Sequence, residues 1–313
     1  MKMWSLTLVA LCCCSLLLVG CGGTSGVSSP FAPSQGSPNA APQFSQVVLV
    51  VEENHSYSDV IGNPNMPFLN SLATKNALAT NYFADSHTSI GNYFMLTAGQ
   101  IVTLNDAFTG VIGDDNIVRE LTAAGKTWRS YAESLPSVGY LGGDVYPYFK
   151  HHNPFTYFTD VTTNASQGAN LVPFSQFATD LAANRLPNFS FIAPNVEHDA
   201  HDCPGGGNDC ADTAKLVAAD NWLRDNITPL LNNPTFKSNG LLLIVFDEGN
   251  LLDFENVGGH IPLVVVSSRA KSGFQSTTKY MHESTLRLIL QTLGAKGFPG
   301  VSATAPDMGE FFH

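Results

Sequence analysis

Two apolar runs that end in carboxylates limit most strongly how this chain can fold. Residues 47–51 are consecutive aliphatic residues, and a Glu-Asn pair stands at 53–54, where the run has ended. Residues 241–246 form a second such run and lead directly into an Asp-Glu pair at 247–248. Continuous apolar runs of this length are typical of strands buried on both faces, and open α/β sheets bind ligands at the carboxyl edge. We therefore predict a metal site that distant parts of the chain build at one sheet edge.

Strand-like and helical segments alternate through the rest of the chain. The predicted strands are residues 47–51, 127–131, 187–194, 241–246 and 261–266. The predicted helices are residues 67–78, 117–124 (capped by Asp114 and Asp115), 212–231 and 283–293. This alternation predicts an α/β fold with a mostly parallel sheet and helices on both of its faces.

The N-terminal residues 1–21 have the pattern of an export signal. Lys2 is followed by an apolar stretch that is too short to span a membrane comfortably. The stretch ends in Leu-Val-Gly-Cys, which resembles the bacterial lipobox and makes Cys21 a candidate lipid anchor. We expect an exported, membrane-anchored lipoprotein in the periplasm or on the cell surface. An ordinary secretory signal is the alternative.

The remaining chain divides into a linker and one domain. Residues 22–43 are rich in Gly, Ser, Pro and Ala, which predicts a flexible tether. Residues 44–313 have the size of one large α/β domain. In that domain Cys203 and Cys210 bracket a short Gly-rich loop, and an oxidising compartment favours a disulfide between them.

The charge of the chain excludes one class of partner. Acidic residues number 26 and basic residues 15, and no Lys/Arg cluster is present. This balance argues against nucleic acid as a partner. No pattern in the sequence indicates a protein partner.

Residues 87–99 are predicted to form a loop that leads into a helix, because Thr-Ser and Gly-Asn precede an apolar run. A serine at a helix start lies near unpaired backbone N–H groups and the positive end of the helix dipole. The same donors can hold phosphoryl oxygens, so such a serine is suited to attack phosphorus. Ser89 is therefore a candidate nucleophile, and a plain helix cap is the alternative.

Several histidines and acids extend the candidate site. Residues 198–202 alternate imidazole and carboxylate just after a predicted strand, a pattern that can ligate a metal or orient a leaving group. A solvated polar loop is the alternative for this segment. His260 precedes one predicted strand and His282 the last predicted helix. A single histidine of this kind is more often structural than catalytic.

Taken together, these segments resemble a bacterial and fungal phosphoesterase family that includes acid phosphatases and phospholipases C. The matching segments, in the family's order, are Glu53-Asn54-His55-Ser56-Tyr57, His87-Thr88-Ser89-Ile90-Gly91-Asn92-Tyr93, Tyr131-Ala132-Glu133, His152-Asn153-Pro154-Phe155, residues 198–202, Phe246-Asp247-Glu248, residues 262–267 and His282-Glu283-Ser284. The resemblance covers essentially the whole domain. It implies the alkaline-phosphatase-like fold, a three-layer α/β/α arrangement with a mostly parallel central sheet.

The resemblance also implies roles for individual residues. It places a divalent metal among Glu53, Asn54, Asp247 and Glu248, with Ser89 as nucleophile. Thr88 stands where the family usually has proline, which leaves Thr88 as an alternative nucleophile.

Further residues are expected to bind the substrate and transfer protons. Asn54, Asn92 and His87 are assigned to substrate binding. His201, with His282 or His260, is expected to protonate the leaving alcohol.

The identity and number of the metal ions stay open at this point. Carboxylates favour Mg, Ca or Mn, whereas imidazoles permit Zn or Fe. A second ion requires Asp199, His201 and either His260 or His282 to converge.

The function expected from these residues is hydrolysis of small phosphate monoesters through a phosphoseryl intermediate. The first alternative is a phospholipase C-type diesterase, against which no obvious exposed amphipathic segment for lipid capture is apparent. The second alternative is a surface lipoprotein that binds a ligand without catalysis.

Overall fold

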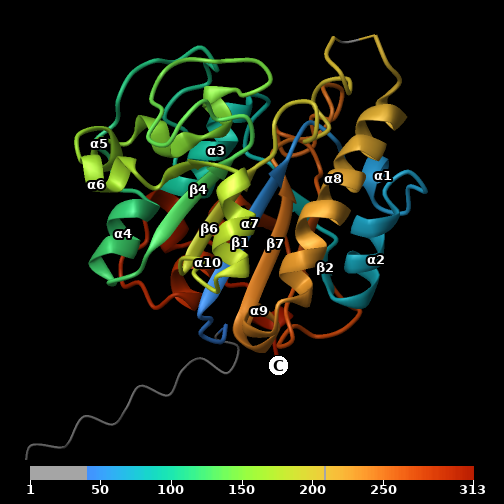
Figure 1. Ribbon diagram of the computed structural model, residues 1–313. Helices are drawn as coiled ribbons and strands as arrows, with labels where there is room; N and C mark the ends of the chain where they lie inside the picture. The colour runs from blue at the N-terminus through green and yellow to red at the C-terminus, as the bar shows by residue number, and fades with distance from the viewer. Residues whose placement is uncertain (1–40, 208) are drawn as a thin grey trace, which may run out of the picture. The chain divides into compact units, whose positions relative to one another are not determined.

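The computed structural model describes residues 41–207 and 209–313 (Figure 1). The predicted signal segment, Cys21 and nearly all of the predicted linker lie outside these residues. The strands are β1 (Gln46–Glu52), β2 (Ala77–Ala79), β3 (Tyr82–Phe83), β4 (Trp128–Ala132), β5 (Leu171–Pro173), β6 (Phe189–Ala193), β7 (Gly240–Phe246), β8 (Leu263–Val266), β9 (Phe274–Ser276) and β10 (Tyr280–Met281). The α-helices are α1 (Tyr57–Val60), α2 (Pro67–Lys75), α3 (Ser89–Ala98), α4 (Ile117–Ala123), α5 (Thr159–Thr162), α6 (Ala165–Gly168), α7 (Ser175–Ala182), α8 (Asp212–Asn232), α9 (Pro234–Asn239) and α10 (His282–Thr292).

The central sheet has the order β5-β4-β6-β1-β7-β8-β2-β9, and β3 and β10 form a separate parallel pair. Within the central sheet β8 runs antiparallel to both of its neighbours, and all other pairings are parallel. The mostly parallel sheet predicted from the sequence is therefore confirmed. β1 and β7 are adjacent and parallel, so they end at the same edge of the sheet (Figure 1).

Helices cover both faces of the sheet. Neighbouring residues of a strand point to opposite faces, so their contacts show which helix lies on each face. Phe191 packs edge-on against Tyr93 of α3, while Tyr131, whose partner in the next strand is Ile192, packs against Phe177 of α7. α3 and α10 pack against each other, as do α2 and α8. The core of β1 is completely buried, as the apolar run predicted. Among residues 41–207 and 209–313, none of the helices combines the length and the hydropathy that a membrane span requires.

Some predicted boundaries were wrong. The helix predicted over residues 67–78 ends at Lys75, because residues 77–79 pair with β8 and β9 as strand β2. The helix-forming alanines of β2 are outweighed by hydrogen bonds to two strands. Asn116, rather than Asp114 or Asp115, caps α4: its side chain accepts hydrogen bonds from the backbone N–H groups of residues 118 and 119.

Candidate active site

The acids predicted at the ends of the two strands lie side by side. Asn54 has a positive φ of 54°, which turns the chain so that its backbone N–H donates to Asp247 Oδ1 at 3.1 Å. The N–H of Glu248 donates to the same oxygen at 2.6 Å. The side chains of Glu53 and Asp247 are fully buried. Buried acidic side chains therefore cluster at the edge of the sheet where β1 and β7 end. This cluster is called the acid group below.

Ser89 reaches this group from the first turn of α3. Its Oγ donates to Glu53 Oε2 at 3.1 Å, and Tyr93, one turn later, donates from its hydroxyl to Glu53 Oε1 at 2.5 Å. Thr88 is the extended residue before the helix, and its buried hydroxyl has no hydrogen-bond partner. Of the two candidate nucleophiles, Ser89 is the one in contact with the carboxylates.

His152, which was not among the predicted site residues, lies between Glu53 and Asp199. Its Nε2 lies 3.4 Å from Glu53 Oε1 and its Nδ1 lies 3.4 Å from Asp199 Oδ2. One ligand atom from each of these three residues lies within 4.8 Å of the others. The ring is held by stacking on Tyr93, at 5.2 Å between centroids. The available signal was the His-Asn-Pro-Phe segment, whose resemblance to the family assigned no role to the histidine.

Burial and mutual repulsion raise the pKa values of these acids. Burial, followed by repulsion from Asp247 and Asp199, raises the pKa of Glu53 well above its usual range. Burial and the neighbouring Asp247 raise the pKa of Glu248 to about 9. Burial also raises the pKa of Asp199 and lowers that of His152, which keeps the imidazole neutral.

The donor set fits a divalent cation. Six buried polar atoms here have no hydrogen-bond partner: Asn54 Oδ1, His87 Nδ1, His152 Nε2, Asp199 Oδ2, Asp247 Oδ2 and Glu248 Oε2. Buried charges need a partner or a metal, and neutral imidazole with carboxylate oxygen is a common ligand set for divalent metals. The Asp199 carboxylate lies beside His152, whereas the second-ion expectation had grouped it with His201 and either His260 or His282.

His282 is buried beneath the site with both ring nitrogens in use. Its Nε2 lies 2.6 Å from the backbone oxygen of Asp247, and its Nδ1 lies 3.2 Å from the Tyr82 hydroxyl. Burial lowers the pKa of His282 to about 4. We expected His282 to donate a proton to the leaving group, but both of its ring nitrogens contact protein atoms. Its contact with the Asp247 backbone oxygen instead helps to position the end of β7.

His260 and Asn92 are likewise committed to the protein itself. His260 Nε2 lies 3.0 Å from the Thr80 backbone oxygen, and the ring stacks on Tyr57. The Asn92 side chain accepts from the N–H groups of residues 85 and 86 and donates to the oxygen of residue 86. This differs from the expected substrate-binding role of Asn92, because its amide shapes the loop before α3.

Two predicted histidines remain close to the acids. His87 Nδ1 lies 3.3 Å from Glu248 Oε2, and its Nε2 lies 2.5 Å from the backbone oxygen of Asp253. His201 Nδ1 pairs with Asp202 Oδ1 at 2.7 Å, while its ring lies 6.1 Å from that of His152. The pairing with Asp202 leaves Nε2 of His201 for another partner.

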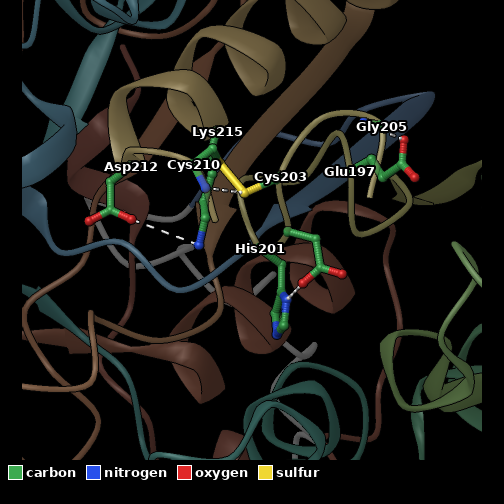
Figure 2. Close-up of a disulfide and its surroundings, with 8 residues drawn as sticks. Glu197, His201, Cys203, Gly205, Cys210, Asp212 and Lys215 are labelled. Atoms are coloured by element: carbon green, nitrogen blue, oxygen red, sulfur yellow. Dashed lines mark hydrogen bonds and ion pairs between the residues drawn. A yellow bond between two sulfur atoms is a disulfide. The ribbon is translucent and has the colours of Figure 1, made fainter. Parts of the chain in front are cut away.

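The predicted disulfide between Cys203 and Cys210 is present and closes the loop that follows His201 (Figure 2). The backbone N–H of Cys210 also donates to Cys203 Sγ. At the start of α8, Lys215 faces Asp212 at 3.8 Å. The disulfide therefore links the segment that carries Asp199 and His201 to the start of α8.

Comparison with known proteins agrees with this geometry. A sequence model described as the Phosphoesterase family matches residues 63–295. The chain is 33% identical to a phosphatidylinositol-3-phosphatase of Mycobacterium tuberculosis, over 88% of this chain and 85% of that protein. It is 30% identical to an acid phosphatase of Aspergillus fumigatus, over 85% of this chain but 58% of that protein. The chain thus spans a little over half the length of this fungal relative.

Solved structures show the same fold at low sequence identity. A protein of the alkaline phosphatase superfamily from Vibrio parahaemolyticus matches with a TM-score of 0.57 and 13% identity, over 83% of this chain and 69% of the other. A lipoteichoic acid synthase from Listeria monocytogenes matches with a TM-score of 0.60 and 10% identity, over 89% and 78%. The alkaline-phosphatase-like fold class expected from the sequence is confirmed.

Proposed function

Because the chain belongs to the Phosphoesterase family, we propose that it is a metal-dependent phosphatase that hydrolyses phosphate monoesters through a phosphoseryl intermediate. One observation carries the proposal: the Ser89 hydroxyl, at the start of a helix, donates a hydrogen bond to the buried carboxylate of Glu53. The phosphatases named among the relatives support the reaction class.

Ser89 is the nucleophile in the proposed reaction. Its Oγ attacks phosphorus and forms the Oγ–P bond, the ester P–O bond breaks, and the Oγ proton passes to Glu53. The positive end of the α3 helix dipole, at Ser89, favours the negatively charged phosphoryl oxygens. The Asn54 amide donates to a non-bridging oxygen. Water then attacks phosphorus, the Oγ–P bond breaks, the proton held by Glu53 returns to Oγ, and phosphate is released.

His201 is the proton donor for the leaving alcohol. Asp202 holds Nδ1, so the proton on Nε2 can pass to the ester oxygen as its bond to phosphorus breaks. Its ring lies near that of His152, with the ring centroids 6.1 Å apart. In the second half of the reaction, the same nitrogen takes a proton from the attacking water.

Two sets of residues are suited to hold the metal. Glu53, Asn54, Asp247 and Glu248 form one set, while Glu53, His152 and Asp199 form the other. When bound, a divalent cation lowers the pKa of the serine hydroxyl and stabilises charge on the phosphoryl oxygens. Carboxylates with imidazole are compatible with Mg, Ca, Mn, Zn or Fe.

We further propose that the protein works outside the cytoplasm, held to a membrane through lipid on Cys21. The lipobox-like end of the signal segment supports this localisation. The disulfide Cys203–Cys210 is consistent with an oxidising compartment.

Hydrolysis of p-nitrophenyl phosphate across pH, with and without chelator, tests the proposed function. We expect chelator to abolish activity and one divalent metal to restore it. Activity that chelator leaves unchanged would overturn the metal dependence. Folded protein that is inactive with every metal would overturn the phosphatase assignment, and a strong preference for a phosphocholine diester would replace it with a phospholipase C.

A further inference from the structure

The loop that follows the Asp247-Glu248 pair is unusually apolar and exposed. Between residues 251 and 257, four apolar side chains face solvent: Leu251 (73% exposed), Leu252 (87%), Phe254 (69%) and Val257 (65%). Isolated exposed apolar residues are ordinary, but a group of this kind marks an interaction surface. The sequence had given no sign of an exposed segment for lipid capture, so this loop is a finding of the structure.

The loop is fixed to the candidate site at its centre and at its base. Asp253 Oδ2 accepts hydrogen bonds from Ser56 Oγ at 2.7 Å and from the N–H of His260 at 3.0 Å. The backbone oxygen of Asp253 lies 2.5 Å from Nε2 of His87, whose Nδ1 faces Glu248. At the base, the N–H of Gly249 donates to the oxygen of Gly258. The apolar side chains are therefore presented at a defined place beside the acids.

Two contacts place apolar residues next to the proposed nucleophile. The Phe254 ring lies edge-on to the His87 ring, with centroids 5.0 Å apart. A second segment approaches the first turn of α3, where the N–H of Ile90 donates to Asp106. In this segment Leu104 is 56% exposed, and a Cβ on Gly91 would lie 3.1 Å from its Cδ2. Apolar side chains thus contact the segments on both sides of Ser89.

We propose that these residues form an apolar rim that docks on the acyl layer of a lipid surface. The apolar rim consists of Leu104, Leu251, Leu252, Phe254 and Val257. The inference rests on the proposed function and names its substrate class: phosphate monoesters of lipids, presented at the surface of a membrane. The phosphate enters the acid group at Ser89 while the acyl chains stay in the layer that the rim contacts.

One cation lies beside the loop, which also carries the exposed carboxylate of Glu255. Lys279 is exposed, and its Nζ lies 2.5 Å from Asn256 Oδ1 of the loop and 5.4 Å from the centroid of the Phe83 ring. A long cationic side chain beside apolar surface is favoured at a membrane interface.

The predicted anchor at Cys21 is compatible with docking of the apolar rim on the membrane that holds the anchor. The predicted linker, residues 22–43, can span up to about 70 Å when extended. The candidate site lies at the carboxyl end of β1, whose seven residues extend over only about 23 Å from the end where the linker joins. A chain held through Cys21 therefore has enough length to present the apolar rim to the same membrane.

Hydrolysis of a lipid phosphate in vesicles, compared with hydrolysis of a soluble phosphate ester, tests the proposal. The substrates are dioleoyl phosphatidic acid in phosphatidylcholine vesicles and soluble p-nitrophenyl phosphate. The test variant is L251S/L252S. The matched control is Val301→Ser, because Val301 is 51% exposed and its N–H bonds to Gly99, at the far end of α3 from Ser89. All proteins keep the same N-terminal segment, so anchoring contributes equally to each.

We expect L251S/L252S to lose at least about tenfold in the vesicle reaction and to keep the p-nitrophenyl phosphate rate, as the loss of burial for two leucines implies. The control should keep both rates. A double variant that keeps the vesicle rate would overturn the proposal, as would wild-type protein that cleaves p-nitrophenyl phosphate but not the vesicle lipid.

A binding measurement separates failure of the rim from failure of the phosphatase. Leu252→Trp should show a blue-shifted emission with phosphatidylcholine–phosphatidic acid vesicles, and Val301→Trp should not. This shift supports docking even if neither substrate is cleaved, in which case only the proposed function fails. A blue shift that grows with protein concentration without vesicles would assign the rim to a second copy of the chain and overturn the proposal.

Discussion

Ser89 Oγ donates to Glu53 Oε2 at 3.1 Å, although the two residues belong to a helix and a strand end 36 positions apart. This contact joins a hydroxyl at the start of a helix to one oxygen of a buried carboxylate. On its other oxygen, Glu53 accepts from Tyr93 and faces His152. Glu53 is thus the residue through which the nucleophile, the first strand and the histidine side of the site are connected.

Replacing Ser89 with alanine should lower kcat for p-nitrophenyl phosphate by at least about a thousandfold, because it removes the nucleophilic hydroxyl of the proposed reaction. Circular dichroism and thermal unfolding should stay near wild type, since the substitution removes one small side-chain atom. Thr88→Ala is the matched control and should keep most of its activity. The opposite result for the two variants would transfer the nucleophile to Thr88.

Replacing His201 with alanine should affect substrates according to their leaving groups. An alkyl phosphate needs a proton on its departing oxygen, so its kcat should fall by roughly a hundredfold or more. p-Nitrophenolate leaves without a proton, and its kcat should fall much less. His260→Ala serves as the control, since the Thr80 carbonyl engages its ring nitrogen. An equal loss on both substrates would argue against proton donation by His201.

The metal-free protein should become more stable as pH is lowered from about 9 towards 6. Burial and Asp247 raise the pKa of Glu248 to about 9 in the folded state, against a usual value of 4.5. Between these pH values the folded state binds more protons than the unfolded chain, so stability falls as pH rises. Thermal melts of chelated protein across this range test the direction. Added metal should remove most of the dependence, and a chelated protein that gains stability with rising pH would contradict the account.

Breaking the disulfide should lower stability without removing the active site. The Cys203–Cys210 bond closes a short loop, for which the chain-entropy relation gives about 2.5 kcal/mol. A C203S/C210S variant should therefore melt at a lower temperature than wild type, and reductant should lower the melting temperature of wild type only. The variant should keep its activity well below its melting temperature. Equal melting temperatures would show that the loop needs no cross-link.

The central strands of the sheet could be predicted from the sequence, because a continuous apolar run of this length indicates a buried strand. The strands at residues 47–51 and 241–246 are apolar throughout, and their order along the chain places their ends at one edge. β2 was missed because three residues with two alanines carry almost no strand signal, and only their pairing with β8 and β9 decides. Local propensity cannot supply that information.

The candidate site also contains residues that could be predicted from the sequence and residues that could not. Glu53 and Asp247 could be grouped in advance, because both stand at the ends of predictable strands. His152 lies on a short 3-10 helix, and no spacing in the sequence relates it to Asp199 or Glu53. The contributions of His260 and His282 depended on which backbone carbonyl each ring meets, a tertiary contact that residue type does not reveal.

The position of β1 in the sheet has a consequence for biosynthesis. Within the residues that the structure describes, β1 is the first strand to leave the ribosome, yet its neighbours β6 and β7 begin at Phe189 and Gly240. For most of translation or export, the apolar, mostly β-branched run at residues 47–51 therefore has no partner strand and both of its edges are open, which favours aggregation. Folding that depends on such distant pairing is also slow. We therefore expect the unfolded chain to require a chaperone until its last third is available.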